Sequence, residues 1–170
     1  MKLRYYKFEK NNHFVAMEYY WLILNRSYFI LITDDYLIGI QGNGIISVEA
    51  GTDFLIGLGN MAVRGDLKNP YSYMKASYFE NILDVDLLSE EFLTMNSFNF
   101  RINKKEIKNV YHDSKKKWGM GYYPHDGKVY IETIDGKKRE LIILGNQSGD
   151  EIVKWISTRQ LDFKSNKQIK

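Results

Sequence analysis

A run of three lysines followed by a tryptophan is the group of residues best suited to chemistry in this chain: Lys115, Lys116, Lys117 and Trp118. Four further lysines are expected to lie near it: Lys104, Lys105, Lys108 and Lys128. Clustered ammonium groups can hold a phosphate, an acidic partner or an anionic membrane, at about 1 kcal/mol per basic residue near such a membrane. The competing interpretation is a solvated turn, because lysine runs usually lie at the surface.

Two histidine–aspartate pairs, His112-Asp113 and His125-Asp126, offer imidazole and carboxylate groups, which are good metal ligands. If the two pairs faced each other across a hairpin, they could form a metal site. Both pairs fall at expected turns, however, where aspartate is favoured because it hydrogen-bonds to the local backbone. The turn interpretation is preferred, and the sequence predicts no metal site.

Catalytic and cofactor-binding motifs are not recognisable in the chain. The glycine-rich stretches at residues 42–44 and 57–59 fit neither the GxxxxGK[ST] nor the GxGxxG pattern in a strand-to-helix setting. Ser148 is explained as a helix cap rather than as a nucleophile. We therefore expect a non-catalytic protein without a cofactor.

The elements that must position these residues are clearest between Phe98 and Leu161. Apolar and polar residues alternate from Phe98 to Ile102, which is the period of a half-buried strand. Four more strands are predicted, over residues 105–112, 118–123, 129–134 and 141–144. Residues 124–127 (Pro-His-Asp-Gly) predict a turn, because proline presets φ and glycine supplies a positive φ.

The sequence around Asp135-Gly136 predicts a β-hairpin. A two-residue loop would pair Glu132 with Arg139, whereas a three-residue loop over Asp135–Lys137 would pair Ile131 with Leu141. Burying an aliphatic side chain gains roughly 1.5–3 kcal/mol, but a cross-strand charge pair gains only about 0.2–1 kcal/mol. We therefore prefer the three-residue loop. It directs four apolar residues to the core: Val129, Ile131, Leu141 and Ile143.

A capping box starts the C-terminal helix, with Ser148 at the N-cap and Glu151 three residues later. The helix then carries an apolar stripe at helical spacing: Ile152, Val153, Trp155 and Ile156. We expect the stripe, with Trp155 at its centre, to close one end of the sheet structure. Residues 164–170 are polar and are interpreted as a flexible tail.

The N-terminal part of the chain predicts strands over Leu3–Phe8, Tyr28–Thr33 and Tyr36–Ile40, the last two joined at Asp34-Asp35. The apolar run Phe14–Leu24 is compatible with either a strand or a helix. Residues 42–97 are interpreted as a helical insertion. It comprises a helix over Thr52–Arg64, a helix opened by Asn69-Pro70 and a helical turn within Leu87–Met95 that starts at Asp86 or Ser89.

Composition favours one β-rich domain over residues 1–163 of the 170-residue chain. Aromatic residues make up 15%, with 13 tyrosines, and there is no cysteine, which excludes disulfide and cysteine–zinc frameworks. A net charge of +3 is too small to favour nucleic-acid binding. Since neither a signal peptide nor a membrane span is recognisable, we expect a cytoplasmic protein, with peripheral membrane attachment as an alternative.

Three segments in this order resemble the bacterial pleckstrin-homology-like and GRAM-like superfamily: the strand–turn–strand unit 28–39, the segment 100–107, and the terminal helix with Trp155. The resemblance covers roughly residues 20–41 and 98–161. It implies two near-orthogonal antiparallel sheets with the final helix plugging one open end. Lipid-binding members use a basic cluster between the first strands, where this chain has Arg26 and the acidic Asp34-Asp35.

The predicted fold is therefore α+β: an antiparallel β-barrel or two-sheet sandwich, capped by a C-terminal helix and carrying a helical insertion. The predicted function is a non-catalytic binding or scaffold module for a protein partner. The first alternative is binding to an anionic membrane or phospholipid headgroup through Lys115–Lys117. The second is an enzyme with an unrecognised site. The sequence leaves the oligomeric state open.

Overall fold

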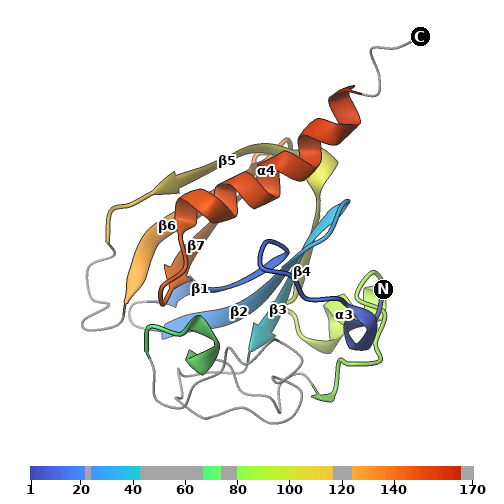
Figure 1. Ribbon diagram of the computed structural model, residues 1–170. Coiled ribbons are helices and arrows are strands. Elements are labelled where there is room, and N and C mark those ends of the chain that lie inside the picture. The colour runs from blue at the N-terminus through green and yellow to red at the C-terminus, as the bar shows by residue number, and fades with distance from the viewer. Residues whose placement is uncertain (22–23, 43–66, 74–79, 117–123, 166–170) are drawn as a thin grey trace.

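Seven strands form one curled antiparallel sheet in the computed structural model, which describes residues 1–21, 24–42, 67–73, 80–116 and 124–165 (Figure 1). Their order across the sheet is β4-β3-β2-β1-β7-β6-β5. The strand bounds are β1 His13–Trp21, β2 Leu24–Ile32, β3 Tyr36–Gly42, β4 Phe100–Asn103, β5 Ile107–Asp113, β6 His125–Thr133 and β7 Lys138–Leu144. Because β4 and β5 each have one neighbour among the described strands, the sheet is a half-barrel with two edges.

Two α-helices and three short 3-10 helices accompany the sheet within the described residues. Their bounds are η1 Leu3–Tyr5, η2 Pro70–Tyr73, α3 Glu90–Met95, η3 Lys104–Glu106 and α4 Gly149–Ser165. None of the described helices is long and apolar enough to cross a membrane. The fold was predicted as α+β, and its barrel-like antiparallel sheet with a C-terminal helix is confirmed, although the described residues are mostly β. The predicted alternative of two sheets is wrong, because the described strands pair into a single sheet.

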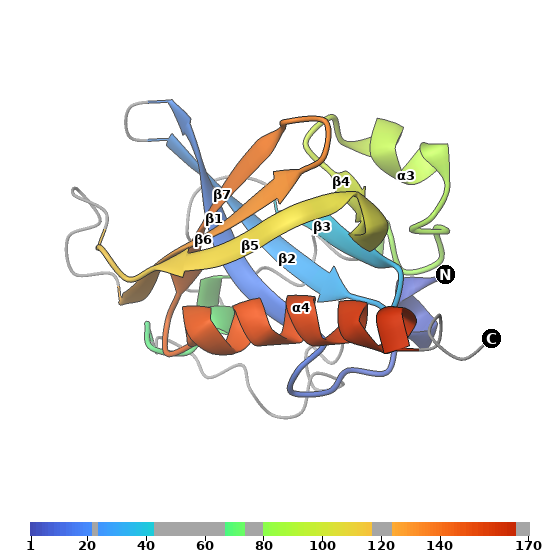
Figure 2. The same ribbon diagram turned by 90° about the horizontal axis from the view of Figure 1, so that it is seen from above.

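All seven strands contribute to the buried inner face of the curled sheet, where α4 packs mainly against β5 and β6 (Figure 2). Ile152 and Ile156 of α4 have no exposed surface, whereas Trp155 and Val153 are half-buried against the same cluster. Ser148 caps the helix as predicted, with its hydroxyl accepting a hydrogen bond from the Glu151 amide at 3.3 Å. The apolar stripe is thus confirmed, but the two isoleucines rather than the tryptophan carry the fully buried contact.

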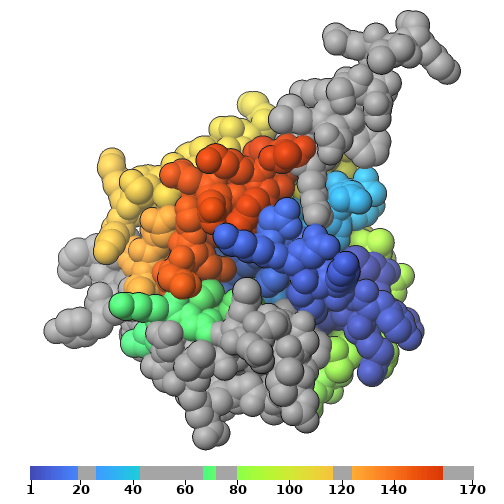
Figure 3. All heavy atoms as spheres, viewed as in Figure 1, coloured from blue at the N-terminus to red at the C-terminus, as the bar shows by residue number. Residues whose placement is uncertain are grey.

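The outer face of the central strands is buried as well, beneath segments that are distant in the sequence. The covering side chains are Leu3, Tyr71, Ile82, Leu87 and Phe92. Figure 3 shows the N-terminal residues, in blue, on the same surface as α4, in red. Burial on both faces explains why β1 to β3 read as continuous apolar runs, and why periodicity left Phe14–Leu24 ambiguous. That run is a strand, β1.

The N-terminal segment differs from its prediction, because Leu3–Tyr5 forms a 3-10 helix instead of a strand. Ion pairs to a distant segment hold it: the N-terminal amine contacts Asp86, and Arg4 contacts Asp84 at 2.6 Å. Leu3 is thereby inserted into the outer cluster as a single buried anchor.

Of the predicted mid-chain helices, the turn that starts at Ser89 is confirmed. Helix α3 begins after Ser89, whose side chain accepts a hydrogen bond from the Phe92 amide. A helix also begins at Pro70 as predicted, although it is a single 3-10 turn. The helix predicted over Thr52–Arg64 lies outside the described residues.

The β2–β3 hairpin at Asp34-Asp35 is confirmed, but the β6–β7 hairpin has a different register from the predicted one. Ile131 pairs with Arg139 instead of Leu141. The Gly136 amide donates to Thr133, so the loop lies one residue earlier than expected. The predicted and observed registers differ by two residues. Because side chains alternate between faces with a period of two, the same residues still face the core. All four apolar residues are buried on the inner face: Val129, Ile131, Leu141 and Ile143.

The turn predicted over residues 124–127 is instead a bulge near the start of β6, where the register shifts between His125 and Lys128. Gly127 has a φ of 64°, and a Cβ there would lie 2.2 Å from the Asp113 carbonyl oxygen. Bulges and turns both use glycine at a positive φ, so the same residues signal either structure.

Candidate binding site

The lysine run follows the end of β5. Lys115 and Lys116 are exposed, and the Asp113 side chain accepts a hydrogen bond from the Lys115 amide at 3.0 Å. Neither ammonium group has an ion-pair partner in the part of the chain that is described. Lys117 and Trp118 lie outside the described residues, so the predicted group is described only in its first half.

Of the four other lysines, Lys128 lies near this run, because it pairs with Asp113, two residues before Lys115. Lys104 is only 3% exposed, and it lies with Lys105 at the opposite end of β5. Seven strand residues separate the two ends, about 23 Å at 3.3 Å per residue. The Lys128 ammonium group forms an ion pair with the Glu140 carboxylate at 2.7 Å. The expected lysine cluster is therefore wrong for Lys104 and Lys105, whereas Lys128 lies near the run as expected.

The two histidine–aspartate pairs do meet, but the contact joins α4 to the sheet. His112 Nδ1 lies 3.0 Å from Asp150 Oδ1, and Nε2 lies 2.7 Å from the Asp126 carbonyl oxygen. The Asp126 carboxylate accepts a hydrogen bond from the Gly149 amide at the start of α4. Burial of the ring opposes its protonation, but these hydrogen bonds outweigh that effect and raise the pKa of His112. No metal-binding group of three such side chains occurs among the described residues.

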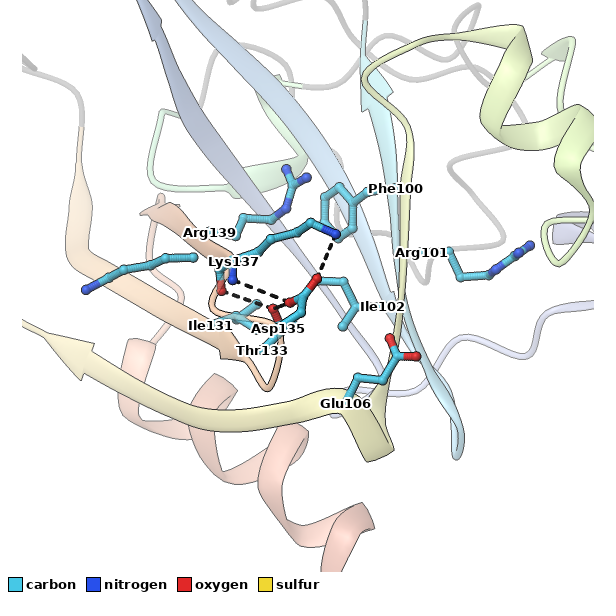
Figure 4. Close-up of a pocket in the computed structure, with 10 residues that line it drawn as sticks. Phe100, Arg101, Ile102, Glu106, Ile131, Thr133, Asp135, Lys137 and Arg139 are labelled. Carbon is cyan, nitrogen blue, oxygen red and sulfur yellow. Dashed lines mark hydrogen bonds and ion pairs between the residues drawn. The ribbon is translucent and has the colours of Figure 1, made fainter.

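A cavity of about 440 Å³ lies between β4 and the tip of the β6–β7 hairpin (Figure 4). We call it the seam, because it lies where the half-barrel does not close. Phe100, Ile102 and Ile131 form its apolar floor. Charged and polar residues complete the lining and are called its rim: Arg101, Glu106, Thr133, Asp135, Lys137, Lys138 and Arg139.

The outer edge of β4 faces the seam. Figure 4 shows Phe100 and Ile102 projecting toward the hairpin and Arg101 projecting the opposite way. Because consecutive strand residues point to opposite faces, a cavity lined by all three runs along the strand edge. Within the described residues, β4 pairs with β3 alone.

The hydrogen-bond pattern shows which backbone groups of β4 point away from β3. The Lys104 amide donates to the Asp35 carbonyl at 2.8 Å. Antiparallel pairs alternate between bonded and non-bonded positions, so Ile102 and Phe100 bond to β3. The amide and carbonyl groups of Arg101 and Asn103 therefore point toward the free edge.

Arg139 holds one wall of the seam in place. Its guanidinium carbon lies 3.8 Å from the centre of the Phe100 ring, and Nη1 donates to both oxygens of Glu18 at 2.8 and 2.7 Å. These two contacts join three strands, because Glu18 lies on β1, Phe100 on β4 and Arg139 on β7. Arg139, which pairs with Ile131, is therefore packed against Phe100 on the inner face.

The hairpin tip forms the opposite wall. The Asp135 carboxylate accepts hydrogen bonds from Lys137 and Thr133, which lower its pKa to about 2. Lys137 is 84% exposed on its side chain, so its ammonium group is accessible to solvent at the mouth of the seam.

Sequence reasoning did not identify the seam. Its residues come from β4 and from a hairpin about thirty positions later, and nothing local marks β4 as an edge strand. A second cavity, of about 430 Å³, lies where α4 meets η2, with Trp155, Tyr71 and His13 among its residues. Burial lowers the pKa of His13 to about 4, so this ring is neutral.

A scan of protein-family models finds no match to this chain, and a search of curated proteins finds none either. Among solved structures, the C-terminal domain of an unknown protein from Leishmania infantum matches over 91% of this chain and 77% of its own. The sequence identity is 10% and the TM-score is 0.36. A likeness at that TM-score carries no conclusion, so the site is interpreted from its own geometry.

Proposed function

We propose that the protein is a non-catalytic binding module that accepts an extended segment of a partner protein as an added strand on β4. The supporting observation is that β4, which pairs with β3 alone among the described strands, lines the seam, a cavity with an apolar floor. Strand addition gains affinity from main-chain hydrogen bonds and specificity from pockets for alternate side chains. The volume of about 440 Å³ lies within the range of ligand sites, roughly 300–1,000 Å³.

The β5 edge is less suited to strand addition. Lys108 and Asn109 are exposed there, and the pairing register shifts between Ile107 and Asn109. Charged side chains, particularly lysine, and irregular pairing are features that protect sheet edges from other strands. The described edge of β4 has regular pairing and an apolar floor beside it, so we assign the partner to β4.

Asn103 allows a matched test. Its φ of −69° suits proline, and its outward amide is one of the groups that an added strand would use. Its side chain also accepts a hydrogen bond from the Lys105 amide at 2.9 Å. Asn103→Pro removes both the amide and this contact, whereas Asn103→Ala removes the contact alone. The difference between the two variants isolates the backbone amide.

The experiment begins with selection of peptides from a random display library against the whole protein. Recovered peptides should bind wild type and Asn103→Ala alike, and bind Asn103→Pro about two- to tenfold more weakly, as expected for one lost hydrogen bond of about 0.5–1.5 kcal/mol. Recovery of no peptide, or equal binding to both variants, would contradict strand addition on β4.

A second candidate function is attachment to an anionic membrane, favoured by the exposed Lys115 and Lys116 without acidic partners in the described residues. Changing Lys115, Lys116 and Lys117 together to Glu should then weaken co-sedimentation with phosphatidylserine vesicles by a factor on the order of a hundred, at about 1 kcal/mol per lysine. Absence of wild-type binding, or unchanged binding of the variant, would exclude this function.

A further inference from the structure

The added strand meets two different surfaces along β4, and we infer from them that the partner segment carries an acidic residue between two apolar residues. This inference rests on the proposed strand addition and names the chemistry of the partner. It follows from which β4 side chain lies on each face of the sheet.

Pleating fixes the alternation. Residues opposite each other on antiparallel strands share a face, with Cβ atoms about 4.5–5.5 Å apart, and their neighbours point to the other face. Arg101 lies on the outer face, whereas Phe100 and Ile102 lie on the inner face. The partner residue opposite Arg101 therefore lies beside a guanidinium, and its two neighbours lie beside apolar side chains.

Arg101 is held in position to receive an acidic side chain. Its guanidinium donates to the Leu88 and Ser89 carbonyls and to the Glu90 carboxylate at 3.0 Å. The Arg101 side chain is 19% exposed and fixed by these contacts, whereas that of Glu90 is 82% exposed. A fixed cation with a solvated partner can accept a second carboxylate without rearranging its own anchors.

The inner face requires apolar neighbours. Ile131 is 1% exposed and Phe100 is 6% exposed, and both form the floor onto which these side chains would project. A charged group placed there would lose its hydration without an ionic partner, which is unfavourable. Branched aliphatic side chains suit both the strand conformation and this floor.

The rim of the seam has an excess of cations, with Arg101, Lys137, Lys138 and Arg139 against Glu106 and Asp135. Each cation already contacts a carboxylate, so the rim alone does not determine the partner's charge. The position of Arg101 on the free edge carries the inference, and the rim is compatible with it.

The test uses a display library of extended heptapeptides in which the three central positions are varied, selected against wild type, Arg101→Glu, Arg101→Gln and Lys108→Glu. The Lys108→Glu variant changes the net charge as much as Arg101→Glu does, but on β5. Wild type and Lys108→Glu should enrich apolar–acidic–apolar sequences. Arg101→Glu should enrich lysine or arginine at the centre, and Arg101→Gln should lose the preference.

Two synthetic peptides that differ only by glutamate or glutamine at the centre provide the affinity measurement. The glutamate peptide should bind wild type about two- to fivefold more tightly, the range of a cross-strand ion pair, and bind Arg101→Gln equally. Enrichment without a central acidic preference, or the same preference in Arg101→Gln, would overturn the inference while leaving strand addition in place. Failure of every peptide to bind wild type would overturn both.

Discussion

At the scale of single residues, His112 is the group whose charge state connects the sheet to α4. Both ring nitrogens face oxygen acceptors, Asp150 on one side and the Asp126 carbonyl on the other, so the protonated ring satisfies both. A histidine whose pKa is raised on folding contributes stability that is fully present below its unfolded pKa of about 6.5. That contribution is lost as the pH rises through the folded-state pKa.

The first prediction is that the free energy of unfolding falls less steeply between pH 6 and 9 in His112→Gln than in wild type. Urea titrations at several pH values would measure this. His13 acts in the opposite direction below pH 6.5, because burial lowers its pKa to about 4. Both proteins contain His13, so its effect cancels in the difference between their free energies of unfolding. Identical pH profiles of the two proteins would contradict the raised pKa of His112.

The second prediction concerns the close contact between Gly149 and the His112 ring. A Cβ at Gly149 would lie 2.3 Å from the His112 ring, so Gly149→Ala should destabilise the protein by about 1–3 kcal/mol through overpacking. The cost should largely disappear in a His112→Ala background, where the space is free. Thermal or urea unfolding of the four proteins in this double-mutant cycle measures the coupling, and additive costs would show that the contact is absent.

At the scale of elements, α4 is held by two fully buried isoleucines rather than by its tryptophan. Ile152→Ala and Ile156→Ala should each cost about 2–5 kcal/mol, the range for truncating a buried aliphatic side chain. Lys154→Ala, on the exposed face of the same helix, should stay within about 0.5 kcal/mol of wild type. Urea midpoints would compare them, and equal costs at Lys154 and Ile152 would contradict the described helix face.

The elements also show what local sequence determines. The core orientation of β6 and β7 was predictable, because it depends only on which alternate residues are apolar. Their register was not, because either register keeps the apolar residues inside, and Arg139 contacts Glu18, more than a hundred positions away, in the observed one. Likewise, the glycine at residue 127 signalled a positive φ correctly. Whether that φ serves a turn or a bulge is decided by the neighbouring strand.

At the scale of the whole molecule, the seam lies where the seven described strands stop short of closing. Edge strands are defined by the complete strand order, so neither β4 nor the cavity beside it could be predicted from local patterns. The predicted lysine cluster is wrong for Lys104 and Lys105, because β5 separates them from Lys115, whereas Lys128 lies opposite Asp113 near the run. The barrel-like fold was accessible from the sequence, whereas the site formed by its opening was not.

Amide hydrogen exchange at β4 tests the proposed strand addition most directly. In the free protein, the amides of Phe100 and Ile102 should be protected by β3, and those of Arg101 and Asn103 should exchange readily. Addition of a selected peptide should protect Arg101 and Asn103 and leave the other two unchanged. A bound peptide that leaves the Arg101 and Asn103 amides exchanging as before would contradict the proposal.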